Sequence, residues 1–163
     1  MSDFEERLAR AVARGSDRAE AQKQEARAAK LSEEELKTLH TKYRLSLSEH
    51  IETCVKRLPD HFPGFGIETI YGERGWGASA SRDDFGGTSS TTGRNSVYSR
   101  LEMTIRPYSS LQVVELAGKG AVRNKEVFNR THFRKIDEVD EAQYIKLIDA
   151  WIVEFAEQFA ASR

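Results

Sequence analysis

The chain contains almost no cysteine. Cys54 is the only one in 163 residues, so no intrachain disulfide can form and a zinc site of four cysteines is excluded. Small secreted domains usually depend on disulfides, and a chain without them is typical of a reducing compartment. We therefore expect a cytoplasmic protein.

Long apolar runs and a secretory start are missing as well. No apolar stretch approaches the length of about 18 residues that indicates a membrane-spanning helix. Residues 1–6 lack the basic start and the apolar core of a signal peptide. The sequence thus predicts that the chain does not span a membrane.

An excess of either charge is absent too. Lys and Arg number 25 against 26 Asp and Glu, for a net charge of −1, so no overall field draws the chain to nucleic acid or to an anionic membrane. The hydrophobic fraction of 39% is enough for a folded core, and 163 residues is the usual size of one domain. A charged partner must therefore use a local patch.

Residues 1–31 are rich in Ala, Arg, Glu and Gln and contain no proline, a composition that favours a helix. The apolar stripe of this helix is thin: it begins with Phe4, Leu8, Ala11 and Val12, and only alanines continue it beyond Ser16. Such a helix cannot be held on a core by burial alone. We expect residues 1–31 to form either a helical arm that packs on a partner subunit or a frayed, partly disordered segment, which is the usual state of a chain terminus.

A second helix is expected from Ser32. Ser32 and Glu35 form a Ser-x-x-Glu capping box, and Pro59 lacks the N–H that a continuing helix would need. The spacing predicts an amphipathic helix up to Leu58, which opens a single α+β domain over residues 32–163. The apolar ridge of this helix consists of Leu39, Tyr43, Leu47, Ile51 and Val55.

Between residues 64 and 136 the pattern changes to alternation, which indicates strands and is clearest over Val97–Arg106. Gly118-Lys-Gly120 predicts a tight connection, and the parity of Phe133, opposite to that of Phe128, predicts a bulge near residues 129 and 130. The glycine-rich and serine-rich stretch Asp84–Ser96 predicts a loop. We expect four or five antiparallel strands.

The last helix has the strongest pattern. Asp140 can cap it, and its wide apolar face contains Tyr144, Leu147, Ile148, Trp151, Ile152, Phe155 and Phe159. The sequence therefore predicts the α+β class: an N-terminal helical arm, a long amphipathic helix, a four- or five-stranded antiparallel meander, and a C-terminal amphipathic helix packed on the sheet.

Known catalytic patterns are absent from the sequence. There is no Gly-x-Ser-x-Gly elbow, and Cys54 lies inside a predicted helix instead of at its N-terminus, where a thiolate is favoured. His50 and Cys54, four residues apart, could bind zinc together with His61, but no second close-spaced pair completes a usual zinc pattern. We predict no catalytic residue, no cofactor and no metal site.

The least ordinary feature is a basic hairpin over residues 119–135, in which six Lys and Arg side chains stand against a single acid, Glu126. Aromatic and guanidinium groups on the neighbouring strand are of the kind that contact bases and phosphates. The alternative, which we favour, is a solvated strand face whose charges pair with Glu102, Glu115 and Glu126. The residues that would contact an anion or a partner are Tyr98, Arg100, Arg106, Arg123, Lys125, Arg130, His132 and Arg134.

These patterns do not identify a function. They favour a non-enzymatic binding or assembly module that self-associates as a homodimer or binds a protein partner. One alternative is an anion or nucleic-acid binder that uses the basic hairpin 119–135. A further alternative is an enzyme whose site has no recognised sequence pattern.

Overall fold

The computed structural model describes residues 2–85 and 96–162. It confirms the α+β class, with a long N-terminal helix, a five-stranded antiparallel sheet and a C-terminal helix. The chain divides into two compact units, Met1–Thr38 and Leu39–Arg163. Most of the loop expected over Asp84–Ser96, residues 86–95, lies outside the described residues.

Helix α1 runs from Ser2 to Val55 without a break. The predicted helix start at Ser32 is therefore wrong. Strong helix formers lie on both sides of this serine and neither glycine nor proline separates them, so the helix continues through the capping pattern. Helix α2 (Leu58–His61) follows and has Pro59 in its first turn, where the missing N–H costs no intrahelical bond.

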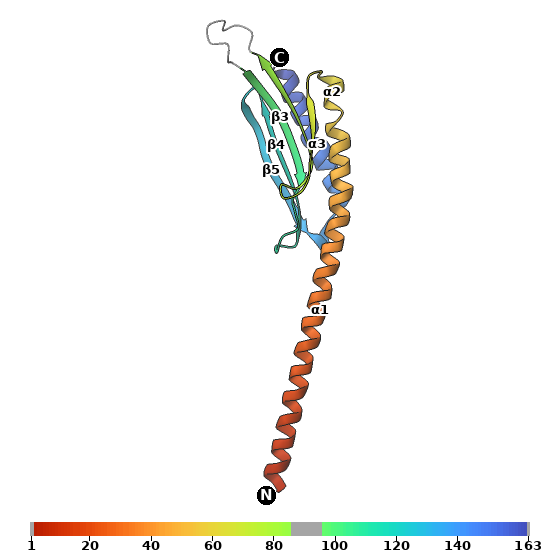
Figure 1. Ribbon diagram of the computed structural model, residues 1–163, viewed down its shortest axis with the longest axis vertical. Helices are drawn as coiled ribbons and strands as arrows, with labels where there is room; N and C mark the ends of the chain where they lie inside the picture. The colour runs from red at the N-terminus through yellow and green to blue at the C-terminus, as the bar shows by residue number, and fades with distance from the viewer. Residues whose placement is uncertain (1, 86–95, 163) are drawn as a thin grey trace. The chain divides into compact units, whose positions relative to one another are not determined.

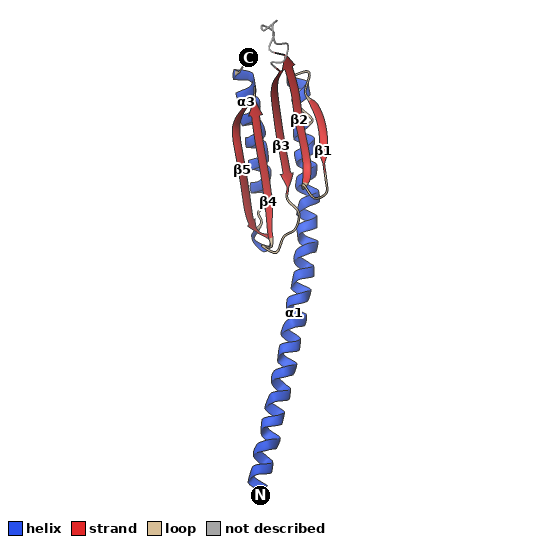
Figure 2. Cartoon of the chain, turned by 60° about the vertical axis from the view of Figure 1, so that its left-hand side comes forward, coloured by secondary structure: helices blue, strands red, loops and turns tan. Residues whose placement is uncertain are grey.

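The sheet is a meander in which each strand pairs antiparallel with the next along the chain, in the order β1-β2-β3-β4-β5 (Figure 2). All-antiparallel pairing is the arrangement that the alternating pattern predicted. The strands are β1 (Gly66–Ile70), β2 (Trp76–Phe85), β3 (Ser96–Ile105), β4 (Val113–Val122) and β5 (Lys125–Lys135).

The β4–β5 connection differs from the prediction. Gly118 and Gly120 lie inside β4, and the turn falls instead at Arg123 and Asn124, which both have positive φ (48° and 70°). The pairing of β4 with β5 does shift register, but between Gly120 and Ala121, not opposite residues 129 and 130. Phe133 needs no bulge because its side chain is 57% exposed and is not part of the core.

The helix α3 (Glu141–Ala161) packs on the sheet as predicted, and it begins after the 3-10 turn Ile136–Glu138. The Asp140 side chain accepts a hydrogen bond from the Ala142 N–H and caps it. Trp151 of α3 lies against Phe128 of β5, with ring centroids 6.4 Å apart. None of the described helices combines the length and the apolar character that crossing a bilayer requires.

The core of unit 39–163 lies between one face of the sheet and two helices, α3 and the part of α1 from Leu39 onward (Figure 1). Leu101, Met103 and Ile105 of β3 point into this core and are fully buried. The alternate positions therefore lie on the opposite face, which no described helix covers. We call it the open sheet face; it includes Tyr98, Arg100, Glu102, Thr104, Glu115, Lys119, Asn129, Thr131 and Phe133.

Candidate functional site

The structure does not bring the predicted anion-binding residues together. Tyr98 and Arg100 lie on the open sheet face, whereas Arg130, His132 and Arg134 alternate along β5 on the side that faces α3. The two groups are on opposite faces of one sheet. A single basic surface made of all the predicted residues therefore does not exist.

The group on the α3 side is used in packing. Arg130 donates two hydrogen bonds to the Glu154 carboxylate, at 2.6 and 3.1 Å, and its guanidinium lies 5.1 Å from the Phe128 ring. His132 makes an edge contact with Tyr144, and burial, followed by the charge of Arg134, lowers the pKa of His132. The Arg130 charge is thus paired with a carboxylate, and the charged form of His132 is disfavoured.

The turn residues contribute little to a shared site. The Nε–H of Arg123 donates to the Ser162 hydroxyl at 3.3 Å, so this guanidinium is directed towards the end of α3. Lys125 is exposed at the start of β5. Neither the Arg123 nor the Lys125 side chain forms an ion pair with a described residue.

On the open sheet face, the predicted residues form a chain of charge-assisted hydrogen bonds. Arg100 donates to the Tyr98 hydroxyl at 3.4 Å and to Glu102 at 3.2 Å, and Arg74 donates to the same carboxylate at 2.7 Å. The bond to Tyr98, and more weakly the Glu102 charge, raise the pKa of Arg100. The sequence analysis missed Arg74 because it lies in the β1–β2 connection, outside the basic hairpin.

A polar groove of about 340 Å³ crosses this face beside Glu102. Arg106 and Lys119 border it, and within the described residues neither has a carboxylate at ion-pair distance. Arg106 was among the predicted contacts, and Lys119 lies in the predicted hairpin. The groove is lined by Arg74, Glu102, Thr104, Arg106, Ala117, Gly118, Lys119, Asn129 and Thr131.

A second, apolar groove of about 500 Å³ lies at the other end of β4 and β5. Leu111 and Phe133, which line it with Val113, are 76% and 57% exposed. Exposed large apolar side chains that adjoin polar ones are typical of protein-contact surfaces. This groove was not predicted, because the bulge expected near residues 129 and 130 would have turned Phe133 to the same face as Phe128.

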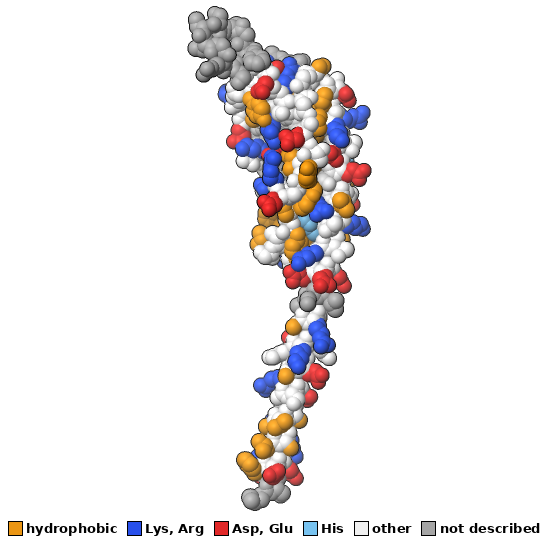
Figure 3. All heavy atoms as spheres, in the orientation of Figure 1, with side chains coloured by type: hydrophobic (Ala, Val, Ile, Leu, Met, Phe, Trp, Pro, Cys, Tyr) orange, Lys and Arg blue, Asp and Glu red, His pale blue; other side chains and the backbone are white. Residues whose placement is uncertain are grey.

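The unit of residues 1–38 carries an apolar surface of its own. Every side chain from Asp3 to Ala28 is exposed, including Phe4 (68%), Leu8 (52%) and Val12 (63%). Figure 3 shows hydrophobic side chains gathered near the N-terminal end of the helix. The described part of this unit therefore has large apolar side chains and no core to bury them.

One group of potential metal ligands is present among the described residues. It contains His50 and Cys54, the two α1 residues whose spacing the sequence analysis noted, but its third member is Asp149 of α3 instead of His61. His61 is exposed in α2. Asp149 was missed because its approach to α1 depends on how α3 docks.

Comparison with known proteins gave no match: no family model, curated protein or solved structure resembles this chain. The proposals on function therefore rest on the geometry of these sites and on the chemistry of their residues.

Proposed function

We propose that the protein is a non-enzymatic assembly module that forms a homodimer through its N-terminal helix. The observation that carries this proposal is the row of exposed Phe4, Leu8 and Val12 on a helix with no buried side chain from Asp3 to Ala28. Exposed apolar side chains in a row gain free energy when a partner removes them from water. The single cysteine supports a cytoplasmic location for this assembly.

A second copy of the same helix fits this stripe better than an unrelated partner. At spacings of three and four residues the stripe is bulky up to Val12 and continues with Gly15, Ala19, Gln22 and Ala26, three of which are small. Two antiparallel copies centred on Gly15 would lay Phe4 and Val12 of one copy over Ala26 and Ala19 of the other. Leu8 would then lie over the aliphatic stem of Gln22. Gly15 has open space around it, so nothing in the described chain explains this glycine inside a helix.

The charges beside the stripe agree with the same pairing. In an antiparallel pair centred on Gly15, Glu5 of one copy comes next to Lys23 of the other, and Arg7 comes next to Glu25. Residues 3–28 contain equal numbers of acidic and basic side chains, so a second copy is not repelled. An interface that relates a patch to itself is the usual arrangement of a two-fold dimer.

The mass of the full chain in solution tests this proposal. We expect sedimentation equilibrium to give twice the chain mass of 18.5 kDa, and Leu8→Glu to return it to the single-chain value, because each dimer would bury two unpaired carboxylates. Leu45→Glu is the matched control, since Leu45 is a similarly exposed leucine (57%) of α1 outside the arm. A wild-type monomer, or a dimer that survives Leu8→Glu, would reject the proposal.

A second candidate function is anion binding in the polar groove, favoured by the charges of Arg106 and Lys119, which have no carboxylate partner among the described residues, and by the Thr104 and Thr131 side chains beside them. This replaces the basic hairpin 119–135 as the contact surface, since Arg130 already pairs with Glu154. Nucleic acid remains a less favoured ligand, because the net charge of the chain is −1.

Titration of labelled single-stranded RNA and of heparin at several salt concentrations tests this second candidate. Arg106→Ala and Lys119→Ala should each weaken binding. Each should also reduce the slope of the logarithm of the affinity against the logarithm of the salt concentration by about one. Arg130→Ala should leave both unchanged. Binding that depends on Arg130 but not on Arg106 would place the ligand on the hairpin, and absence of binding at low salt would eliminate the function.

A further inference from the structure

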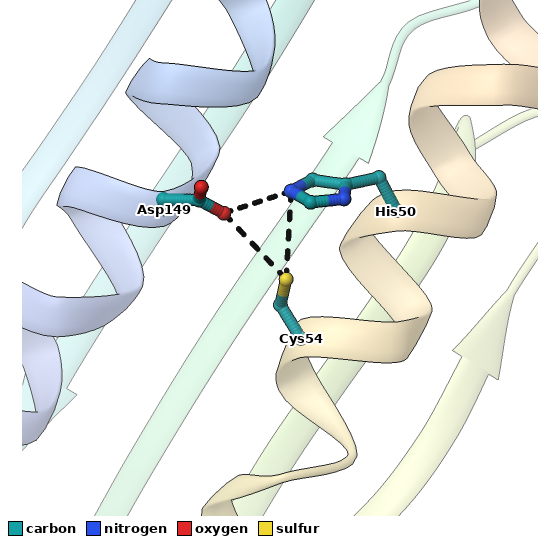
Figure 4. Close-up of side chains that lie close together, drawn as sticks. All are labelled: His50, Cys54 and Asp149. Carbon is teal, nitrogen blue, oxygen red and sulfur yellow. Dashed lines mark hydrogen bonds and ion pairs between the residues drawn. The ribbon is translucent and has the colours of Figure 1, made fainter.

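His50, Cys54 and Asp149 direct their ligand atoms towards one point between α1 and α3 (Figure 4). His50 and Cys54 are one helical turn apart on α1 and therefore share a face. The His50 Nε2 atom lies 2.7 Å from Asp149 Oδ1, and the Cys54 sulfur lies 3.5 Å from His50 Nε2 and 3.6 Å from Asp149 Oδ1.

These separations are close to those around a tetrahedral zinc ion. Zinc–ligand bonds of about 2.3 Å to sulfur and about 2.0 Å to nitrogen and oxygen place S···N and S···O pairs about 3.5 Å apart and N···O pairs about 3.3 Å apart. Both sulfur distances already have these values. Only the His50–Asp149 separation must lengthen, by roughly half an ångström, which a carboxylate on an exposed side chain accommodates.

A Cys-His-Asp catalytic triad does not explain the arrangement. In a triad the imidazole contacts the nucleophile through one ring nitrogen and the carboxylate through the other, whereas here both partners approach Nε2 of His50. Burial, and next the Asp149 charge, raise the pKa of Cys54 to about 11. The free thiol is therefore protonated at neutral pH and is a poor nucleophile.

We propose that His50, Cys54 and Asp149 bind a divalent metal ion of the zinc class. The ligand set of one thiolate, one imidazole and one carboxylate suits zinc and cobalt(II) and disfavours magnesium and calcium, which prefer oxygen ligands alone. On binding, the sulfur–metal bond replaces the S–H bond and the proton passes to solvent.

Three protein ligands leave the fourth position of a tetrahedral ion for water. Half of the Asp149 side chain and 29% of the His50 side chain are exposed, so water reaches this position. A mainly apolar groove of about 300 Å³ adjoins Cys54 and is lined also by Arg57, Leu58, His61, Phe62, Ile152, Val153 and Ala156. The site is thus open to water and is bordered on one side by apolar side chains.

The rest of the α1–α3 contact holds these ligands in place. A hydrogen bond between Ser46 and Glu141 joins the same two helices one turn before His50. The ligands on α1 and the ligand on α3 are therefore near one another without the ion, which lowers the cost of ordering them when it binds.

Cobalt(II) titration of the metal-free full chain tests the proposal. We expect one ion per chain, with a sulfur-to-cobalt charge-transfer band and the intense visible bands of tetrahedral cobalt. Cys54→Ser should abolish the charge-transfer band, and Asp149→Asn and His50→Gln should each weaken binding at least tenfold. His61→Gln is the matched control and should stay within about twofold of wild type, because His61 is a nearby histidine outside the group.

A second measurement needs no variant. In the wild-type chain, saturating zinc should slow alkylation of Cys54 by iodoacetamide at least tenfold, whereas the same concentration of magnesium should not. Equal alkylation rates with and without zinc, or a cobalt spectrum that Cys54→Ser leaves unchanged, would overturn the proposal. Neither measurement depends on dimer formation. If the chain does not form the proposed dimer, only the mass from sedimentation equilibrium shows it.

Discussion

At the scale of single residues, Trp151 is one of the large aromatic contacts between α3 and the sheet. It is buried against Phe128 and over Gly118, where an added Cβ would come within 2.6 Å of the Trp151 ring. Trp151→Ala should lower the free energy of unfolding by about 3–5 kcal/mol, because it leaves a cavity that the sheet cannot close. Urea unfolding measures this, with exposed Val153→Ala as the control, expected within about 0.5 kcal/mol of wild type. A Trp151→Ala protein as stable as that control would contradict the docking of α3.

The contact between Gly118 and Trp151 predicts that an added methyl group lowers the free energy of unfolding. Gly118→Ala places a methyl group against the Trp151 ring, at contacts that van der Waals packing does not allow. The free energy of unfolding should fall by about 1–3 kcal/mol. Gly66→Ala in β1 is the comparison, since an added Cβ there meets only the Ser81 carbonyl oxygen, at an ordinary 3.9 Å. Equal stability of Gly118→Ala and wild type in urea would show that the ring does not fill this space.

His40 predicts how stability depends on pH. Its side chain is 2% exposed, and burial, followed by the charge of Arg44, lowers the pKa of His40 below the ordinary 6.5. As the pH falls below 6.5, the unfolded chain therefore binds more protons at His40 than the folded chain does, and this difference favours unfolding. The stability that neutral His40 gives the folded chain is present above pH 6.5 and is lost below it. The melting temperature should fall from pH 7 to 5, and less steeply in His40→Gln. An identical slope in the two proteins would contradict this role.

At the scale of elements, the two units should separate in their stability. No described side chain of residues 1–31 is buried, and the buried core residues all belong to unit 39–163. Deletion of residues 2–30 should therefore leave the melting temperature of the remainder, measured for monomeric protein, within a few degrees of the full chain. Loss of a cooperative transition after deletion would show that the arm is part of the fold.

The helices and the clearest strand could be predicted from the sequence, because their periodicity is local. Gly118 and Gly120 could not be placed in a strand, because their missing side chains make room for the rings of Trp151 and Phe128. The room that these glycines leave is filled by rings far away in the chain, whereas two glycines separated by one residue locally favour a turn. The continuity of α1 was missed for a related reason: a capping box permits a helix start but does not require one.

The candidate sites show the same limit. The four-residue spacing of His50 and Cys54 is visible in the sequence, but Asp149 lies 95 residues beyond Cys54 and reaches it only when α3 docks beside α1. The basic hairpin was visible as a cluster of charges, yet alternation along β5 and a partner on α3 turned Arg130 away from the open sheet face. The direction of each side chain along the strand, not its residue type, determines which charges lie on the open sheet face.

At the scale of the whole molecule, the proposed dimer requires two chains to meet at Gly15. Disulfide formation tests this most directly, in a Cys54→Ser background that removes the native thiol. Small residues let helices approach closely enough that facing Cα atoms fall within the about 4.4–6.8 Å that a disulfide needs.

Gly15→Cys in this background should therefore oxidise to a covalent dimer at low protein concentration. Asp17→Cys, on the opposite side of the helix, should stay monomeric under the same conditions. Leu8→Cys should also stay monomeric, since antiparallel pairing separates the two copies of position 8 by roughly 20 Å. A covalent dimer through position 8 would show parallel pairing, and failure of Gly15→Cys to cross-link while Asp17→Cys succeeds would contradict assembly through this stripe.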